Sequence, residues 1–371
     1  MKSYAVSDIH GNSERLAVLF DVLKKKHPKN DFKLYVIGDL FDRGDDSDEV
    51  LSLLHENYDN VKVLKGNHEA LFMAFMQNPI DEYINWQMNY SYSTVASFAL
   101  RHFQNLYEQF ADAKDAYLIL RYFNEYSKLD SKLSKKFNLY GGKHSIEAYV
   151  NQITKTVSSR DIRNVGTDLR RVVATAFKGK SKDYIKFFEK YLYVRLLDDF
   201  CNVYDYFDSL DKYAVVDDKF LLVHSGYVSK NINPHVRDSI PEELYNECAT
   251  VEDLAYQSEV PMIWARRTCL KEEKLLTPDE RFDGKIIVFG HTTTNNLNAD
   301  KSADVIFTYD VLGKLASVGI DGGNYGKLRG RLNCLCMNDL SQIVIKGGKD
   351  LPEKIAIEEI PYQDPTGFGK E

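Results

Sequence analysis

Short apolar runs alternate with amphipathic stretches over the first 77 residues. Three runs have the length of buried strands: residues 4–6, 34–37 and 61–64. Between the first two, four apolar residues recur at the spacing of one helical face: Leu16, Leu19, Phe20 and Leu23. After the second run, Ser47 is suited to cap another helix. This strand–helix–strand–helix–strand order predicts parallel strands with helical crossovers, which is an α/β fold.

The pattern changes between residues 78 and 204. This segment is rich in Tyr, Phe, Lys and Asp and lacks the alternation of a strand. Apolar side chains fall at helical spacing in two places: Leu118, Tyr122 and Tyr126, and Ile185, Phe188, Leu192 and Leu196. We therefore expect residues 78–204 to form a mostly helical insertion or cap.

Strand-like runs return after the insertion. They are residues 219–223, 286–289, 305–309, 332–337 and 342–345. We expect residues 1–77 and 205–350 to form one domain. Residues 351–371 contain Pro, Gly and charges, and we expect them to be a C-terminal tail.

Composition narrows the class of protein. Of the 371 residues, 44% are hydrophobic and 28% are charged, as in ordinary soluble enzymes. No stretch approaches the roughly 20 apolar residues that a membrane span needs, and the first residues lack the apolar core of a secretory signal. We therefore expect a cytoplasmic protein without membrane partners. The five cysteines are odd in number and irregularly spaced, which predicts free thiols.

The formal net charge of −7 disfavours non-specific binding to nucleic acid, because such binding needs a basic surface against the backbone phosphates. We therefore expect no nucleic-acid partner. An enzyme for phosphorylated substrates remains compatible with this charge, since a metal pair supplies positive charge locally.

Five short polar motifs each follow an apolar run. They are Ser7-Asp8-Ile9-His10-Gly11, Gly38-Asp39-Leu40-Phe41-Asp42-Arg43-Gly44, Gly66-Asn67-His68-Glu69, His224-Ser225-Gly226 and Gly290-His291-Thr292. Asp, His and Asn side chains suit manganese, iron or zinc better than calcium or copper. One carboxylate can bridge two such ions, and a water between them becomes the nucleophile. Any single motif could be a turn or a helix cap, but all five in order indicate a two-metal site.

The ordered set D-x-H, G-D-x-x-D-R-G, G-N-H-E, H-x-G and G-H-T resembles the signature of the calcineurin-like metallophosphoesterases. The arginine of Asp42-Arg43-Gly44 and the glutamate of Asn67-His68-Glu69 are similar to the phosphoprotein phosphatase branch. Bacterial and phage serine/threonine phosphatases belong to this branch, and symmetrical dinucleoside tetraphosphatases share the pattern. The resemblance covers residues 1–77 and 205–330, and it implies a two-sheet sandwich flanked by helices.

The resemblance also implies roles for the motif residues. Six side chains would hold two divalent metal ions: Asp8, His10 and Asp39 the first, and Asp39, Asn67, His224 and His291 the second. Manganese is the expected metal, and iron or zinc fit the same donors. His68 would be the general acid, with Asp42 orienting it. Arg43 would bind phosphate oxygens through its planar fork.

Two further residues carry weaker resemblances. Arg266 follows Trp264 at the spacing of the W-x-R motif of bacterial members, where a second phosphate-binding arginine is expected, with Arg267 as its rival. Tyr325 lies in a stretch that resembles Asp-Thr-Gly-x-x-Tyr-Gly, although Gly322 and Gly323 stand where Thr and Gly are usual. Tyr325 is expected either to line the substrate groove or to be a packing residue.

These residues imply a metal-dependent phosphomonoesterase with a metal-bridging hydroxide as nucleophile and His68 as general acid. The first expectation is a serine/threonine-type protein phosphatase acting on phosphorylated proteins. The alternative is a hydrolase of dinucleoside polyphosphates or other small phosphate compounds, which a cap closing over the metals would favour. A non-catalytic binding protein is disfavoured, because all ligand positions are filled and His68 is present. The oligomeric state cannot be predicted from the sequence.

Overall fold

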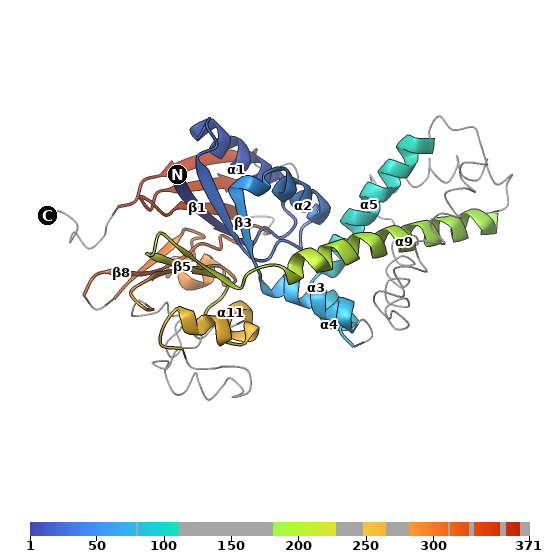
Figure 1. Cartoon of the computed structure of the whole chain (residues 1–371). Coiled ribbons are helices and arrows are strands. Elements are labelled where there is room, and N and C mark those ends of the chain that lie inside the picture. Colours follow the sequence, from blue (N-terminus) through green and yellow to red (C-terminus); the bar gives the residue numbers. More distant parts are fainter. Residues whose placement is uncertain are drawn as a thin grey trace. The chain divides into compact units, whose positions relative to one another are not determined.

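The computed structural model describes residues 1–78, 81–110, 181–227, 248–264, 282–310, 312–325, 330–348 and 354–363 (Figure 1). The chain divides into two compact units. The first comprises Met1–Gly44, Glu49–Glu69 and Leu210–Glu371, and the second comprises Asp45–Asp48 and Ala70–Ser209. The motif residues all belong to the first unit.

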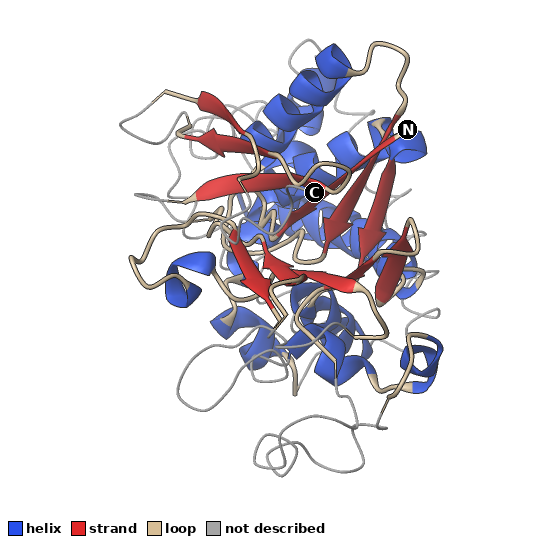
Figure 2. Ribbon diagram, turned by 90° about the vertical axis from the view of Figure 1, so that its left-hand side faces the viewer, coloured by secondary structure: helices blue, strands red, loops and turns tan. Residues whose placement is uncertain are grey.

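The first unit contains a six-stranded sheet with the order β11-β10-β9-β1-β2-β3. Its strands are β1 (Lys2–Ser7), β2 (Phe32–Ile37), β3 (Val61–Leu64), β9 (Arg331–Cys336), β10 (Gln342–Lys346) and β11 (Ala356–Ile360). Figure 2 shows the strands of the protein in red. The connections between β1, β2 and β3 contain α1 (Ser13–Lys26), α2 (Ser47–Glu56) and η1 (Tyr58–Asn60). These three strands are parallel, which confirms the predicted crossovers.

A second sheet has the order β4-β5-β6-β8-β7. Its strands are β4 (Tyr213–Val216), β5 (Phe220–Val223), β6 (Ile286–Phe289), β7 (Ile306–Tyr309) and β8 (Leu315–Gly319). Here β5, β6 and β8 are parallel, while β4 and β7 are antiparallel edge strands. Three short helices lie in the connections between its strands: η3 (Glu252–Tyr256), α11 (Glu259–Trp264) and α12 (Thr294–Leu297).

The two sheets pack face to face through one apolar core. The first sheet contributes Ala5, Ile37, Leu64 and Leu335, and the second contributes Leu222, Val288 and Val318. Helix α1 lies against β10, and its four predicted apolar residues are all buried. This arrangement confirms the predicted α/β sandwich with flanking helices. Its rigid strands provide fixed ends from which polar side chains can project.

Three strands were not predicted from the sequence: β4, β8 and β11. Strand β11 is mostly exposed and lacks apolar alternation, so its side chains give no strand signal. It pairs with β10 through backbone hydrogen bonds, which do not depend on side-chain pattern. The expected tail, residues 351–371, therefore contributes an edge strand to the first sheet.

The described part of the second unit is helical. Its helices are α3 (Asn67–Gln77), whose first residues belong to the first unit, α4 (Tyr83–Met88), α5 (Ser91–Phe110) and α9 (Ser181–Asp208). Helices α5 and α9 contact each other. Phe72 of α3, Trp86 of α4 and Phe200 of α9 form an aromatic cluster. The helical spacing around Ile185 falls in α9, whereas that around Leu118 lies outside the described residues.

No helix in the described ranges combines the length and the apolar character that crossing a membrane requires. Four cysteines lie in these ranges, Cys201, Cys248, Cys334 and Cys336, and all are buried free thiols, as predicted. The fifth, Cys269, lies outside the described residues.

Candidate metal centre

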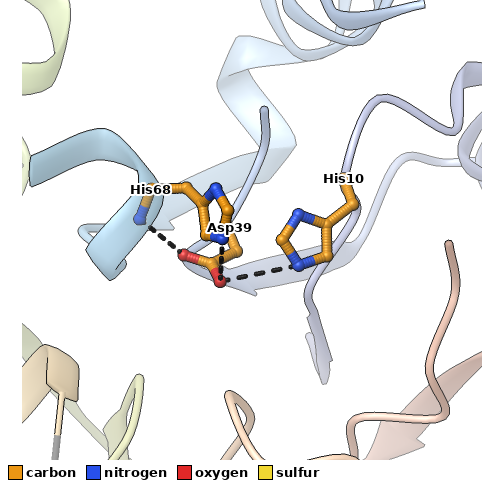
Figure 3. Close-up of side chains that lie close together, drawn as sticks. All are labelled: His10, Asp39 and His68. Carbon is orange, nitrogen blue, oxygen red and sulfur yellow. Dashed lines mark hydrogen bonds and ion pairs between the residues drawn. The ribbon is translucent and has the colours of Figure 1, made fainter. Parts of the chain in front are cut away.

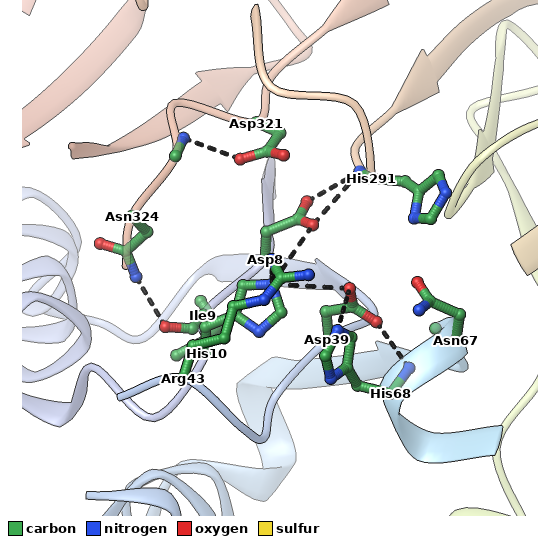
Figure 4. A network of polar contacts seen from close by, with 12 residues as sticks. Asp8, Ile9, His10, Asp39, Arg43, Asn67, His68, His291, Asp321 and Asn324 are labelled. Carbon is green, nitrogen blue, oxygen red and sulfur yellow. Dashed lines mark hydrogen bonds and ion pairs between the residues drawn. The ribbon is translucent and has the colours of Figure 1, made fainter. Parts of the chain in front are cut away.

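The five motifs follow strand ends in the first unit, and Figure 4 shows residues of four of them close together. Asp8 and His10 follow β1, Asp39, Asp42 and Arg43 follow β2, Asn67 and His68 begin α3, His224 follows β5, and His291 follows β6. The backbone N–H of His291 donates to both carboxylate oxygens of Asp8, at 3.2 and 3.0 Å. The two sheets thus bring together residues that are 283 positions apart in the chain.

Several motif residues have a left-handed backbone, which is rare for residues other than glycine. They are Asp8, His10, Asp39, Asp42, Arg43 and His291, with φ between 47° and 72°. Gly38 also has a positive φ of 72°, and a Cβ atom there would lie 2.6 Å from Cα of Gly66 and 2.7 Å from Nδ1 of His224. Each strained non-glycine residue costs about 1–3 kcal/mol, and such clusters mark functional sites.

A single carboxylate, Asp39, lies at the centre of the motif residues (Figure 3). Its Oδ2 is 3.6 Å from Nε2 of His10 and 3.9 Å from Nε2 of His68. Its Oδ1 is 3.3 Å from Nε2 of His224 and accepts the backbone N–H of His68 at 3.0 Å. Burial alone would raise the pKa of Asp39, but the surrounding imidazoles hold it well below its ordinary value. The carboxylate is therefore ionised.

In His10 and His224, the ring nitrogen Nδ1 forms a hydrogen bond with a backbone carbonyl. Nδ1 of His10 donates to the carbonyl of Phe41 at 2.8 Å, and Nδ1 of His224 donates to that of Ile37 at 2.9 Å. In the neutral form of each ring, Nε2 would then carry the lone pair that a metal-bound histidine uses. Burial lowers the pKa of His224, but the charge of Asp39 outweighs it and raises the pKa to about 10. This nitrogen attracts a positive charge, either a proton or a metal ion.

Among the described residues, two groups of donor atoms are close enough to share an ion. They are His10, Asp39 and His68, and Asp39, His224 and His291, with the atoms of each group within 4.8 Å of one another. Asp39 belongs to both groups, as a carboxylate that bridges two metals would. The residues present therefore fit a binuclear centre.

Two expected ligands lie beside these groups. Oδ1 of Asn67 is 3.1 Å from Nε2 of His224. A carboxylate oxygen of Asp8 is 4.0 Å from Nε2 of His10, although Asp8 belongs to neither group. The assignment of single residues to single ions stays a prediction.

His68 has a second carboxylate partner on its other side. Its Nδ1 lies 2.8 Å from Oδ2 of Asp42, and both side chains are fully buried. Burial lowers the pKa of His68, but the charges of Asp39 and Asp42 outweigh it and raise the pKa above the ordinary value. Among the described residues no hydrogen-bond partner occupies its Nε2. This environment favours the protonated ring, in which Nε2 would be the donating atom.

Arg43 and Tyr325 lie at the edge of the centre. Nη1 of Arg43 is 2.7 Å from Nε2 of His10. The Arg43 guanidinium lies 4.4 Å from the centroid of the Tyr325 ring, which also contacts the His10 ring edge-to-face at 5.2 Å. Tyr325 is 40% exposed, so it packs on the centre with one side and faces solvent with the other. Both sequence interpretations of Tyr325 agree with this geometry.

The second expected phosphate-binding arginine lies outside the described residues, as does its rival Arg267. Trp264, two positions before Arg266, is the last described residue of α11. Its indole lies edge-to-face with His291 at a centroid distance of 6.3 Å. The W-x-R interpretation of Arg266 therefore stays a prediction.

Glu69 has a structural role that sequence reasoning did not assign. Its fully buried carboxylate accepts the backbone N–H groups of Asp39 at 2.9 Å, Leu40 at 2.8 Å and Gly66 at 2.8 Å. Burial, followed by the charge of Asp39, raises the pKa of Glu69 to about 7. Glu69 ties the turn after β2 to the turn after β3 and so fixes the backbone of Asp39. Its place in the G-N-H-E motif was the available signal.

Asp321 is a second buried carboxyl, four positions before Tyr325. It is 2% exposed, and burial followed by the charge of Asp8 raises its pKa well above the ordinary value. Its Oδ1 accepts the N–H of Gly323 at 2.8 Å, and its carbonyl accepts that of Thr294 at 2.7 Å. These hydrogen bonds order the loop around Asp321, whose carboxyl interacts with the charge of Asp8.

Replacing Glu69 with Gln should weaken the fold and metal binding together. The amide has one oxygen instead of two, and its NH₂ group faces backbone donors, so at least one buried N–H loses its acceptor. We expect the free energy of unfolding in urea to fall by about 1–3 kcal/mol. We also expect a higher dissociation constant for Mn²⁺ by calorimetry. The exposed Glu359→Gln should change neither quantity measurably, and a Glu69→Gln variant that behaves like it would refute this role.

Replacing Asp39 with Asn should remove both metal ions. The amide is neutral and cannot bridge two cations, so both donor groups lose their shared ligand. Elemental analysis after dialysis should show about two ions per chain in the wild type and a near-complete loss in Asp39→Asn. Asp42→Asn makes the same change of charge outside both groups and should retain the ions. Full occupancy in Asp39→Asn would contradict the bridging position.

Comparison with known proteins agrees with this chemistry. Residues 1–175 match the family model of the calcineurin-like phosphoesterases. A symmetrical bis(5'-nucleosyl)-tetraphosphatase of Buchnera aphidicola subsp. Acyrthosiphon pisum (strain Tuc7) is 41% identical over 76 residues, which are 20% of this chain and 26% of that protein. A zinc-dependent endopolyphosphatase of Saccharomyces cerevisiae is 36% identical over 74 residues, 20% of this chain and 22% of that protein. The chain thus matches only about a quarter of the length of these curated relatives.

Among solved structures, a protein serine/threonine phosphatase from Saccharomyces cerevisiae aligns with 98% of this chain and 80% of its own, at 14% identity and a TM-score of 0.36. The two sheets of this structure establish its α/β sandwich fold. The matched residues carry three of the five motifs, and the folded chain adds His224 and His291 to them. By this match, residues 1–175 of the chain are similar to the calcineurin-like phosphoesterase family.

Proposed function

We propose that this chain hydrolyses phosphate monoesters at a two-metal centre built on Asp39. The observation that best supports the proposal is the placement of His10, His68 and His224 around that one buried carboxylate. Manganese is our first choice of metal, and iron or zinc suit the same donors. Bound divalent ions supply the charge that neutralises phosphoryl oxygens and lowers the pKa of a water.

Arg43 is proposed to bind the transferred phosphoryl group. A guanidinium fork matches two phosphate oxygens with two parallel hydrogen bonds. The group already lies beside His10, at 2.7 Å, so a phosphate held by Arg43 would reach the metal ligands. The ring of Tyr325, 4.4 Å away, supports the guanidinium plane by a cation–π contact.

His68 is proposed to protonate the leaving oxygen. A water loses one proton to solvent, its oxygen bonds to phosphorus as the ester P–O bond breaks, and the departing oxygen takes the proton from Nε2 of His68. Asp42 holds the Nδ1–H at 2.8 Å and stabilises the charged ring before this transfer. A protein that only bound phosphate would have no use for this pair, which is why we prefer an enzyme to a binding protein.

Replacing His68 with Ala should slow hydrolysis according to the leaving group. For an alkyl phosphate, kcat should fall by about 10²–10⁴-fold, because an alkoxide needs the proton. For p-nitrophenyl phosphate the loss should be much smaller, since nitrophenolate leaves without one. Equal losses on both esters would refute the acid role. Elemental analysis of the same variant distinguishes an acid, which leaves both ions bound, from a metal ligand, which does not.

Phosphoserine- and phosphothreonine-containing proteins are our first proposed substrates. The D-R-G arginine and the G-N-H-E glutamate resemble the phosphoprotein phosphatase branch, and symmetrical dinucleoside tetraphosphatases share the same pattern. Dinucleoside polyphosphates are the second candidate. They are favoured by the name of the Buchnera aphidicola relative, whose 41% identity spans 76 residues.

A substrate panel in Mn²⁺, Fe²⁺ and Zn²⁺ separates the two candidates. Phosphopeptides and a dinucleoside tetraphosphate are each assayed at equal concentration, for released phosphate and released nucleotide respectively. We expect kcat/KM for at least one phosphopeptide to exceed that for the dinucleotide. The reverse order would transfer the proposal to the second candidate. Absence of hydrolysis of every ester with every metal would overturn the enzyme proposal itself.

A further inference from the structure

A fully buried arginine on α1 connects two distant loops of the first unit. Arg15 is 1% exposed. Its Nε donates to the carbonyl of Gly347 at 2.9 Å. Its Nη1 donates to the carbonyl oxygen of Asn324 at 2.7 Å and to the side-chain oxygen at 3.0 Å. All three of these acceptors are neutral, and the charge of Glu14 favours the ionised guanidinium.

Burying a charged guanidinium is costly, and an apolar residue would fill the same volume with less desolvation. Arg15 is therefore poorly explained as a packing residue, even though it occupies a buried position on α1 beside the apolar Leu16 and Leu19. Its planar fork fixes the direction as well as the distance of its acceptors. Arg15 directs two of its hydrogen bonds to the loop that carries Asn324.

Asn324 joins this loop to the turn after β1. The side chain is 2% exposed, and its Nδ2 donates to the carbonyl of Ile9 at 2.8 Å (Figure 4). Nδ2 of Asn12 donates in turn to the carbonyl of Asn324 at 3.3 Å. Ile9 lies between the expected ligands Asp8 and His10. The backbone at Asn324 is thus tied to the metal-ligand turn on one side and to Arg15 on the other.

The next residue after this anchor is Tyr325. Its ring contacts the guanidinium of Arg43 at 4.4 Å and the ring of His10 at 5.2 Å. Because Tyr325 is 40% exposed, surrounding packing restrains it only in part. The hydrogen bonds of Arg15 and Asn324 therefore restrain where the tyrosine ring lies, and the ring restrains Arg43.

We propose that Arg15 is a positioning residue for phosphate binding: it acts through Asn324 to hold Tyr325 against Arg43, without touching the substrate. When the Arg43 guanidinium is already held in place, it loses less conformational freedom on binding an oxyanion. The affinity for phosphate therefore rises. The inference rests on the proposed function in taking the anion to be a phosphoryl group.

The test measures binding of inorganic phosphate to the full Mn²⁺-loaded chain by calorimetry. Arg15→Met should raise the dissociation constant by about twofold to fivefold, the range that the loss of an exposed cation–π contact spans. Tyr325→Ala should give a similar increase. In the Tyr325→Ala background, Arg15→Met should add nothing further, because both changes release the same guanidinium. With a phosphate ester as substrate, Arg15→Met should raise KM and change kcat by less than about threefold.

Matched variants separate positioning from stability. Leu19→Ala removes a fully buried side chain from the same helix and should destabilise the fold without changing phosphate affinity. Arg15→Lys keeps one donor without the fork and should recover part of the affinity. Asn324→Ala breaks the same connection from the loop side and should reproduce the effect of Arg15→Met if that variant does not fold.

Three outcomes would overturn the inference: unchanged phosphate affinity in Arg15→Met and Asn324→Ala, additive effects of Arg15→Met and Tyr325→Ala, or an equal loss of affinity in Leu19→Ala. Failure of the proposed function has a different signature. If no ester is hydrolysed but phosphate affinity still depends on Arg15 through Tyr325, the positioning role stands and only the enzymatic proposal falls.

Discussion

The ionised carboxylate of Asp39, buried among three imidazoles, is the interaction on which the site depends. A lone buried charge would be unstable, and burial by itself pushes the carboxyl towards its neutral form. The nearby Nε2 atoms of His10, His68 and His224 reverse that tendency. The same negative charge draws a proton or a metal ion to the ring nitrogens. One residue thus organises the donors and makes cation binding favourable.

The strained backbone around Asp39 is stabilised by parts of the protein that have no proposed catalytic role. Left-handed turns at several motif residues, such as Asp8 and His291, are unfavourable by themselves and persist only where their surroundings over-determine them. The sandwich core supplies rigid strand ends on both sides. Glu69 adds three backbone hydrogen bonds across two turns, and Asp321 orders the loop around it. The site is accordingly preorganised by its scaffold, as electrostatic catalysis requires.

The parallel strands and the positions of the motif residues were predictable because both leave local signals. A buried strand is an apolar run, and the polar motifs follow such runs at once, as Asp8 follows β1 and His224 follows β5. Strand β11 left no such signal, since its mostly exposed side chains do not alternate. Glu69 belonged to a predicted motif, but its role could not be read from the sequence because its acceptor function depends on two turns meeting.

The sequence by itself determined which donors exist, their order along the chain, and the α/β class, because each depends on spacing within a few residues. The tertiary structure alone decided which atoms meet. Asp8 reaches His291 across 283 positions, and Arg15 reaches Asn324 across 309. Such contacts follow from the packing of two sheets through a shared apolar core, where many weak contacts act together and leave no mark at any single position of the chain.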